Sequence, residues 1–276
     1  MPVSGRPRPA LIFIQMKKFF VLAAAAAIAL TSCKNVPVED RIKEYEETLQ
    51  MMEEKANTEY AALETDEDKH AFFEKYSEEM LVFHREVIKK NKNNILSVKA
   101  LQNVYSFMEP DEVESTIATL NDTLKEQKFI AYLIKNIAAK KATAVGEKFT
   151  DFEVDGVKFS DFVGNGKFVL VDFWASWCGP CKAEIPNIKA VYEKYHGDRF
   201  DVLSIAVWDK PEATKASAEE HGIVWNQIIN AQQIPTEIYG IEGIPCIMLI
   251  GPDGTILDRT MRGAQIEEVV AKALAE

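Results

Sequence analysis

The sequence predicts an α/β domain, with a central mixed sheet flanked by helices, preceded by an all-α domain. Residues 34 to about 145 are rich in Glu, Lys, Ala and Leu and lack glycine, a composition that favours helix. Further on, a buried-type strand from Phe168 to Val171 leads into a helix and a second strand from Phe200 to Trp208, which predicts a parallel β-α-β pair. Apolar stretches at 244–250 and 255–261, joined by Gly-Pro-Asp-Gly, predict an antiparallel hairpin in the same sheet.

The first 33 residues resemble a lipoprotein signal peptide. Met16 opens a short basic region, and the uncharged run from Phe19 to Leu30 has the length of a signal-peptide core rather than of a bilayer span. The run ends at Leu-Thr-Ser-Cys, similar to a bacterial lipobox, so we expect a start at Met16 and lipidation of Cys33. The mature protein is then expected in the periplasm or cell envelope, held to a bacterial membrane by lipid. A plain secretory signal with an incidental Cys33 is the alternative.

Residues 34–145 are expected to form about four or five antiparallel helices. Apolar residues recur there at three- and four-residue steps, and helix breaks are expected at Glu64–Asp68, Asn91–Asn94 and Met108–Asp111. His70 and His84 would stand about 21 Å apart along one helix, too far to share a metal, so each is expected to be solvated or in the core. The domain contains no catalytic constellation. Partner docking, dimerisation and simple spacing all remain open as its role.

The overall charge argues against a nucleic-acid partner. The chain has a formal net charge of −11, and a protein this acidic is poorly suited to bind a phosphate backbone. We interpret the charge as favouring solubility.

The C-terminal domain, residues 146–276, contains Cys178 and Cys181 as a C-x-x-C pair directly after a strand and at the start of a helix. Unpaired N–H groups and the helix dipole favour a thiolate at such a position, and thioredoxin itself is a standard example of this effect. We therefore expect Cys178 to be the nucleophile and Cys181 to resolve the mixed disulfide from one turn further on. Pro180 suits the first turn of the helix.

Metal binding is the other use of a C-x-x-C pair. A structural zinc site needs about four ligands, and the remaining candidates, Cys246, His196 and His221, are dispersed along the sequence. We therefore expect no metal site and no cofactor.

The segment from Val171 to Lys182, Val-Asp-Phe-Trp-Ala-Ser-Trp-Cys-Gly-Pro-Cys-Lys, resembles the thioredoxin active site. The Ala-Glu-Ile-Pro that follows, and an extra segment from Trp208 to Ile241, resemble the extracytoplasmic TlpA/ResA-like branch of the family. The resemblance covers roughly residues 146–276 and excludes 34–145. It implies a thioredoxin fold and thiol–disulfide exchange.

The resemblance also implies roles for residues around the dithiol. Substrate-binding positions are expected at Trp177, Gly179, Pro180, Ile244 and Pro245. The Ile244–Pro245 bond would be cis and face the dithiol, and the Ile244 backbone would pair with a client strand; an ordinary proline at a strand start is the alternative. Asp172 matches the buried acid that assists deprotonation of the resolving cysteine, with a hydrogen-bonded structural acid as the alternative.

Two positions depart from the family pattern. Thioredoxin has a lysine next to the acid on the adjacent strand, whereas residues 205–208, Ile-Ala-Val-Trp, supply none. Cys246 follows Pro245, where no thiol is expected, and a buried inert thiol is the preferred interpretation. Trp174 and Trp177 are expected to pack and to line the rim.

These observations predict a membrane-anchored extracytoplasmic thiol–disulfide oxidoreductase that reduces protein disulfides, with an upstream membrane thiol donor as a further partner. A thiol peroxidase is one alternative, although no arginine flanks Cys178 and a paired C-x-x-C favours exchange. A client-binding module with a vestigial redox site is the other.

Overall fold

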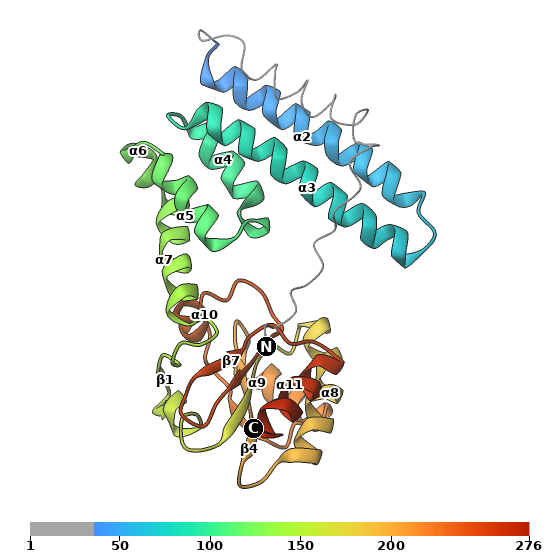
Figure 1. Cartoon of the computed structure of the whole chain (residues 1–276), viewed down its shortest axis with the longest axis vertical. Coiled ribbons are helices and arrows are strands. Elements are labelled where there is room, and N and C mark those ends of the chain that lie inside the picture. Colours follow the sequence, from blue (N-terminus) through green and yellow to red (C-terminus); the bar gives the residue numbers. More distant parts are fainter. Residues whose placement is uncertain (1–35, 276) are drawn as a thin grey trace, which may run out of the picture. The chain divides into compact units, whose positions relative to one another are not determined.

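The computed structural model describes residues 36–275, so Met16 and Cys33 lie outside the described residues. Within this range the chain forms two compact units, residues 36–132 and 133–275, which divide inside one helix (Figure 1). The sequence places the division at 145/146, and the difference is the stretch 133–145, which belongs by its contacts to the second unit. No helix of residues 36–275 combines the length and the apolar character needed to cross a bilayer.

The first unit is helical. Its elements are α2 (Val38–Ala61), α3 (Asp66–Asn91), α4 (Ile95–Val104), a 3₁₀ turn (Tyr105–Phe107), α5 (Pro110–Thr119), α6 (Asp122–Lys125) and the start of α7 (Lys128–Ala142). Two expected breaks coincide with helix starts, because the side chains of Thr65 and Asn94 accept backbone N–H groups of α3 and α4. The third break is short, since Pro110 already opens α5.

The core of this unit encloses one of its histidines. His84 is fully buried beside Tyr45 and Phe83, and its Nδ1 lies 2.7 Å from the Met80 carbonyl oxygen. Burial lowers the pKa of His84. His70 is exposed beside Glu74. One histidine is therefore a core residue and the other is solvated, as expected.

The second unit is built on a five-stranded mixed sheet with the strand order β5-β4-β3-β6-β7. β3 is parallel to β4 and antiparallel to β6, so the predicted parallel pair and hairpin belong to one sheet. The elements are β1 (Glu153–Val154), β2 (Val157–Lys158), a 3₁₀ turn (Phe159–Asp161), β3 (Phe168–Trp174), α8 (Gly179–Tyr195), β4 (Phe200–Ala206), α9 (Pro211–Glu220), β5 (Asn226–Ile228), α10 (Ile234–Tyr239), β6 (Cys246–Ile250), β7 (Ile256–Asp258) and α11 (Ala264–Ala275).

Each face of the sheet has its own core. On one face, Leu170 and Trp174 of β3 pack with apolar residues of α8 and α11, two helices that lie next to each other in Figure 1. On the other, Val171 and Phe173 pack with the β1–β2 hairpin and with Tyr239 of α10. β3 is therefore buried on both sides, as a central strand of a mixed sheet should be.

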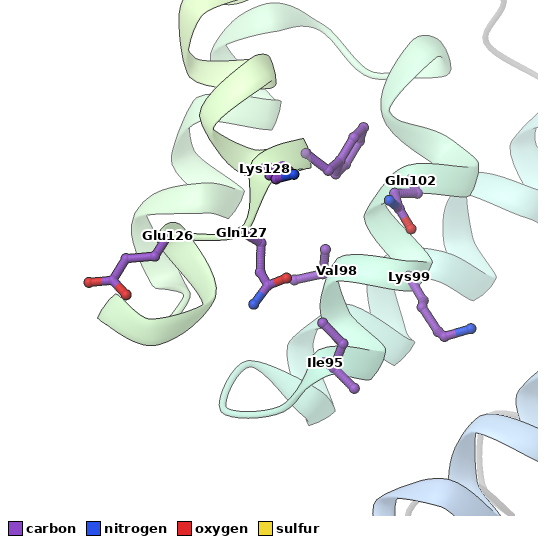
Figure 2. Close-up of a pocket in the computed structure, with 8 residues that line it drawn as sticks. Ile95, Val98, Lys99, Gln102, Glu126, Gln127 and Lys128 are labelled. Atoms are coloured by element: carbon purple, nitrogen blue, oxygen red, sulfur yellow. The ribbon is translucent and has the colours of Figure 1, made fainter.

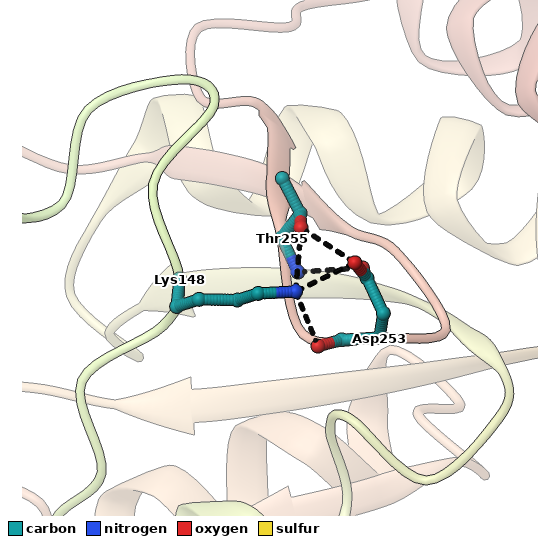
Figure 3. Close-up of polar contacts among 3 residues, drawn as sticks. All are labelled: Lys148, Asp253 and Thr255. Atoms are coloured by element: carbon teal, nitrogen blue, oxygen red, sulfur yellow. Dashed lines mark hydrogen bonds and ion pairs between the residues drawn. The ribbon is translucent and has the colours of Figure 1, made fainter.

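The outer edge of β7 is covered by the chain that follows α7. Gly146 and Phe149 donate backbone hydrogen bonds to Ile256 and Gly254, and Ile256 donates one to Glu147. At the surface, Lys148 Nζ lies 2.6 Å from an Asp253 carboxylate oxygen and 3.0 Å from Thr255 Oγ1 (Figure 3). This pairing removes an open sheet edge, which would otherwise be available to other chains.

Several element bounds differ from the sequence-based expectation. β4 ends at Ala206 rather than Trp208, because Trp208 has a left-handed φ of 53° that turns the chain away. From the sequence, the helix after the dithiol is expected over 182–195 with a kink at Pro186, whereas α8 starts at Gly179 and continues through Pro186. The β1–β2 hairpin was not foreseen, although Asp155-Gly156 at its turn is a recognised hairpin signal.

Candidate functional site

The dithiol lies at the N-terminus of α8. Cys178 is the N-cap residue, Gly179 and Pro180 form the first turn, and Cys178 and Cys181 are joined in a disulfide. The Cys181 backbone N–H donates to Cys178 Sγ over 3.1 Å, so a helix N–H already points at this sulfur. Cys178 is 4% exposed and Cys181 1% exposed. In the reduced protein the same N–H and the helix dipole favour a thiolate on Cys178.

The residues expected to bind substrate surround Cys178. The Ile244–Pro245 peptide bond is cis, and the Ile244 carbonyl oxygen lies 3.7 Å from Cys178 Sγ. Gly179 and Pro180 are exposed on the helix start, while Pro245 is buried. Trp177 is 59% exposed, and its Nε1 donates to the Trp208 carbonyl oxygen over 3.0 Å. The rim thus brings together two loops that are far apart in sequence.

Asp172 lies on the dithiol face of β3. The carboxylate is 1% exposed, and one oxygen accepts a 3.4 Å hydrogen bond from Ser204 Oγ on β4. Its other oxygen has no hydrogen-bond partner among the described residues. Burial raises the pKa of Asp172 to about 7, against the lowering effects of Ser204 and Arg262. The carboxyl group can therefore take up and release a proton near neutral pH.

The charges near Asp172 come from outside its neighbouring strand. Residues 205–208 supply no cation, as the sequence indicates, but the Arg262 guanidinium after β7 lowers the pKa of Asp172 and the Glu184 carboxylate on α8 raises it. Glu184 lies one helical turn after Cys181, on the same side of α8. Asp172 thus faces the helix that carries the resolving cysteine.

A second buried acid, which the sequence analysis missed, fixes the loop that precedes Cys178. Asp209 accepts hydrogen bonds from the Ser176 backbone N–H (2.7 Å) and hydroxyl (3.0 Å) and from Thr214 Oγ1 (2.8 Å). These hydrogen bonds lower the pKa of Asp209 although burial opposes them. Gln232, which like Trp208 has a positive φ, donates to the Asp209 backbone carbonyl. The sequence signal that could have revealed Asp209 is its position just after β4, at the same end of the sheet as the dithiol after β3.

Cys246 lies on the opposite face of the sheet from the dithiol. It pairs with Phe173 across β3 and β6 and packs in the core that contains Phe173. Burial raises the pKa of its thiol to about 11. The thiol is therefore neutral at physiological pH and separated from Cys178 by the sheet.

Two further features of residues 36–275 bear on ligand binding. Among residues 36–275, no group of three or more His, Cys, Asp or Glu is placed to hold a metal ion. A pocket of about 560 Å³ lies in the helical unit between α4 and the start of α7. It is lined by Ile95, Val98, Lys99, Gln102, Glu126, Gln127, Lys128 and Phe129 (Figure 2). Five of these eight residues are polar or charged and none is histidine, cysteine or serine, so the lining indicates no particular chemistry.

A mixed sheet with a C-x-x-C disulfide at a helix N-terminus and a cis-proline loop beside it defines the thioredoxin-like class. Residues 142–259 match the model of the AhpC/TSA family, and this segment is an AhpC/TSA thioredoxin-like domain.

Several similar proteins are named thiol-disulfide oxidoreductases. The thiol-disulfide oxidoreductase ResA of Geobacillus kaustophilus is 29% identical over 136 residues, covering 46% of this chain and 77% of the relative. The Bacillus subtilis ResA is 22% identical over 148 residues, which cover 51% of this chain and 81% of the relative. The thioredoxin domain in a crystal structure of a Bacteroides vulgatus thiol-disulfide oxidoreductase is 30% identical, with a TM-score of 0.40. The match covers 47% of this chain and 95% of that domain. With its C-x-x-C disulfide, the protein is a thioredoxin-like thiol–disulfide oxidoreductase.

Proposed function

We propose that the protein reduces disulfides in other proteins, acting outside the cytoplasm from a lipid anchor at Cys33. The observation that carries this proposal is the environment of Cys178 Sγ. A helix N–H is 3.1 Å away on one side, and the Ile244 carbonyl, where a client backbone would pair, is 3.7 Å away on the other. The anchor and the compartment rest on the sequence of residues 1–33, which lie outside the described residues.

The reaction would proceed in two exchanges. The Cys178 thiolate attacks one sulfur of the client disulfide, forming a Cys178–client bond while the second client sulfur leaves as a thiolate. Cys181 then loses its proton to the Asp172 carboxylate and attacks Cys178 Sγ. The Cys178–client bond breaks, the first client sulfur leaves as a thiolate, and the enzyme is left with the Cys178–Cys181 disulfide. Two electrons have passed to the client, and an upstream thiol donor at the membrane must return them.

The remaining residues around the dithiol would each contact the client or shield the sulfur. Ile244 and Pro245 would receive the client as an added strand by backbone hydrogen bonds, which suits clients of varied sequence. Trp177 would cover the dithiol from the exposed side, since its ring is fixed through Nε1 to Trp208. Gly179 and Pro180, both exposed at the helix start, would form the surface beside Cys178 that a client meets.

The direction of exchange is tested by titrating the protein against reduced and oxidised glutathione. A reductant is expected to have a midpoint more negative than about −220 mV, near that of thioredoxin and below that of disulfide isomerases. A midpoint near −120 mV would instead identify an oxidant. Cys178→Ser serves as the control, because it should show no two-electron transition.

The alternatives and the anchor have separate readouts. Turnover of peroxide without any protein disulfide would favour a thiol peroxidase, and an unchanged cellular phenotype in Cys178→Ser would favour a binding module. The anchor is tested by mass spectrometry of the mature N-terminal peptide. A diacylated or triacylated Cys33 supports it, whereas an unmodified Cys33 or a different N-terminus refutes it.

A further inference from the structure

The corner between β7 and α11 contacts both parts of the exchange site. Arg262, in this corner, donates from Nη2 to the Pro245 carbonyl oxygen and from Nη1 to the Met261 carbonyl oxygen over 2.6 Å. The next residue, Gly263, donates its backbone N–H to Glu184 over 3.0 Å. The corner is therefore fixed to the cis-proline loop on one side and to α8 on the other.

The same guanidinium is the cation that acts on Asp172. Asp172 pairs across the sheet with Ile247, two residues after the Pro245 whose carbonyl Arg262 binds, and the groups that act on its charge are Ser204 from β4, Arg262 from the corner and Glu184 from α8. Among these, Arg262 carries the positive charge. Thioredoxin-like proteins described by the sequence resemblance place a lysine on the adjacent strand for this purpose, and residues 205–208 of this chain have none.

We propose that Arg262 is a positioning residue for disulfide exchange, whose single guanidinium both holds the cis-proline loop for the client and supplies the positive charge facing Asp172. This inference rests on the proposed function. A guanidinium suits both parts, because it has five N–H donors in a rigid fork and keeps its charge at all working pH values. Docking of the client and proton transfer to Asp172 are thereby coupled through one side chain.

The solvent exposure of Arg262 limits the size of the electrostatic effect. Its side chain is exposed, so its charge is partly screened before it reaches the buried carboxyl group. The charge effect should therefore weaken with added salt. The hydrogen bond to Pro245, by contrast, is local and should be much less sensitive to salt.

The test uses the full chain with Arg262→Met, Arg262→Lys and Glu184→Gln, and with the exposed Arg199→Met as the matched control. The Asp172 carboxyl is titrated by carbon-13 NMR in the reduced protein, and kcat and KM for a disulfide-bonded model peptide are measured across pH. Arg262→Met should raise the Asp172 midpoint by roughly half a pH unit, less in 1 M salt, and raise KM several-fold. Arg262→Lys should restore the midpoint but not the full KM, Glu184→Gln should lower the midpoint, and Arg199→Met should change neither.

Each outcome decides the matter. If Arg262→Met leaves either the midpoint or the KM at the wild-type value while the wild-type protein is active, the coupling is refuted. If the wild-type protein shows no exchange, the proposed function fails, and the NMR midpoint still tests whether Arg262 supplies the charge.

Discussion

The two compact units bury polar side chains in different ways. In the helical unit, Thr48, His84 and Asn91 each lie within hydrogen-bond distance of the carbonyl four residues earlier, although Asn91 also accepts from Arg41 of α2. In the sheet unit, buried groups join distant segments: Asp172 bonds to Ser204 and Asp209 to Ser176. Local bonds satisfy a buried group at little cost, whereas bonds between segments fix the relative positions of loops. In the sheet unit, bonds of the second kind lie at the loop that leads to the dithiol.

The largest effect on stability is expected when Asp172 is replaced. Its pKa is about 7 in the folded protein and about 3.8 ordinarily, so the folded state binds more protons between these values. The stability that Asp172 contributes is therefore fully present below pH 4 and is lost as the pH rises through 7. Asp172→Asn should be more stable than wild type by up to about 4 kcal/mol above pH 8 and slower in releasing client.

Urea unfolding followed by tryptophan fluorescence measures this difference. All four tryptophans, at positions 174, 177, 208 and 225, lie in the sheet unit, so the signal reports on that unit alone. Equal stability of the two proteins at pH 8.5 would mean that Asp172 does not bear a buried charge.

A smaller change, here a loss of stability, is expected when Arg259 is replaced. Its guanidinium donates to carbonyl oxygens at the ends of two helices, Thr143 after α7 (2.7 Å) and Tyr239 of α10 (2.7 Å). Arg259→Met leaves these buried carbonyls without donors, which should cost about 2 to 3 kcal/mol. The same fluorescence assay should show an earlier urea midpoint, while Arg199→Met stays within about 0.5 kcal/mol of wild type. A change in Arg259→Met no larger than that in Arg199→Met would show that bonds between segments are not what stabilises this unit.

The smallest effect is expected in the helical unit, at His84. Burial lowers the pKa of His84 below 6.5, so its neutral form is favoured on folding and stability is full above pH 6.5. As the pH falls below 6.5 the unfolded state binds the proton first, so stability should decline progressively toward pH 5, by less than the Asp172 effect. Circular dichroism of the helices should show this loss, and His84→Leu should remove the pH dependence. His70→Gln, at the exposed histidine, should retain it, and a flat wild-type profile would contradict the assignment.

The sequence predicted those parts of the site that are local. Strand β3, the dithiol at the start of α8 and the Ile244–Pro245 loop each have a signal within a few residues. The role of Arg262 could not be assigned, because its partner Pro245 lies far away along the chain, and for Asp209 the sequence indicated its place after β4 but not its partner Ser176. The hairpin at Asp155-Gly156 was predictable in principle, since its turn signal is local.

The most direct test of the central claim is covalent trapping of clients through Cys178. In Cys181→Ser the first exchange can occur and the second cannot, so mixed disulfides on Cys178 should accumulate and dissolve in reducing agent. Cys178→Ser should accumulate none. Adding Cys246→Ser to Cys181→Ser should not change the yield, because Cys246 lies on the other face of the sheet. If Cys181→Ser with Cys246→Ser traps no more client than Cys178→Ser in the cell envelope, the two-step exchange is wrong for this protein.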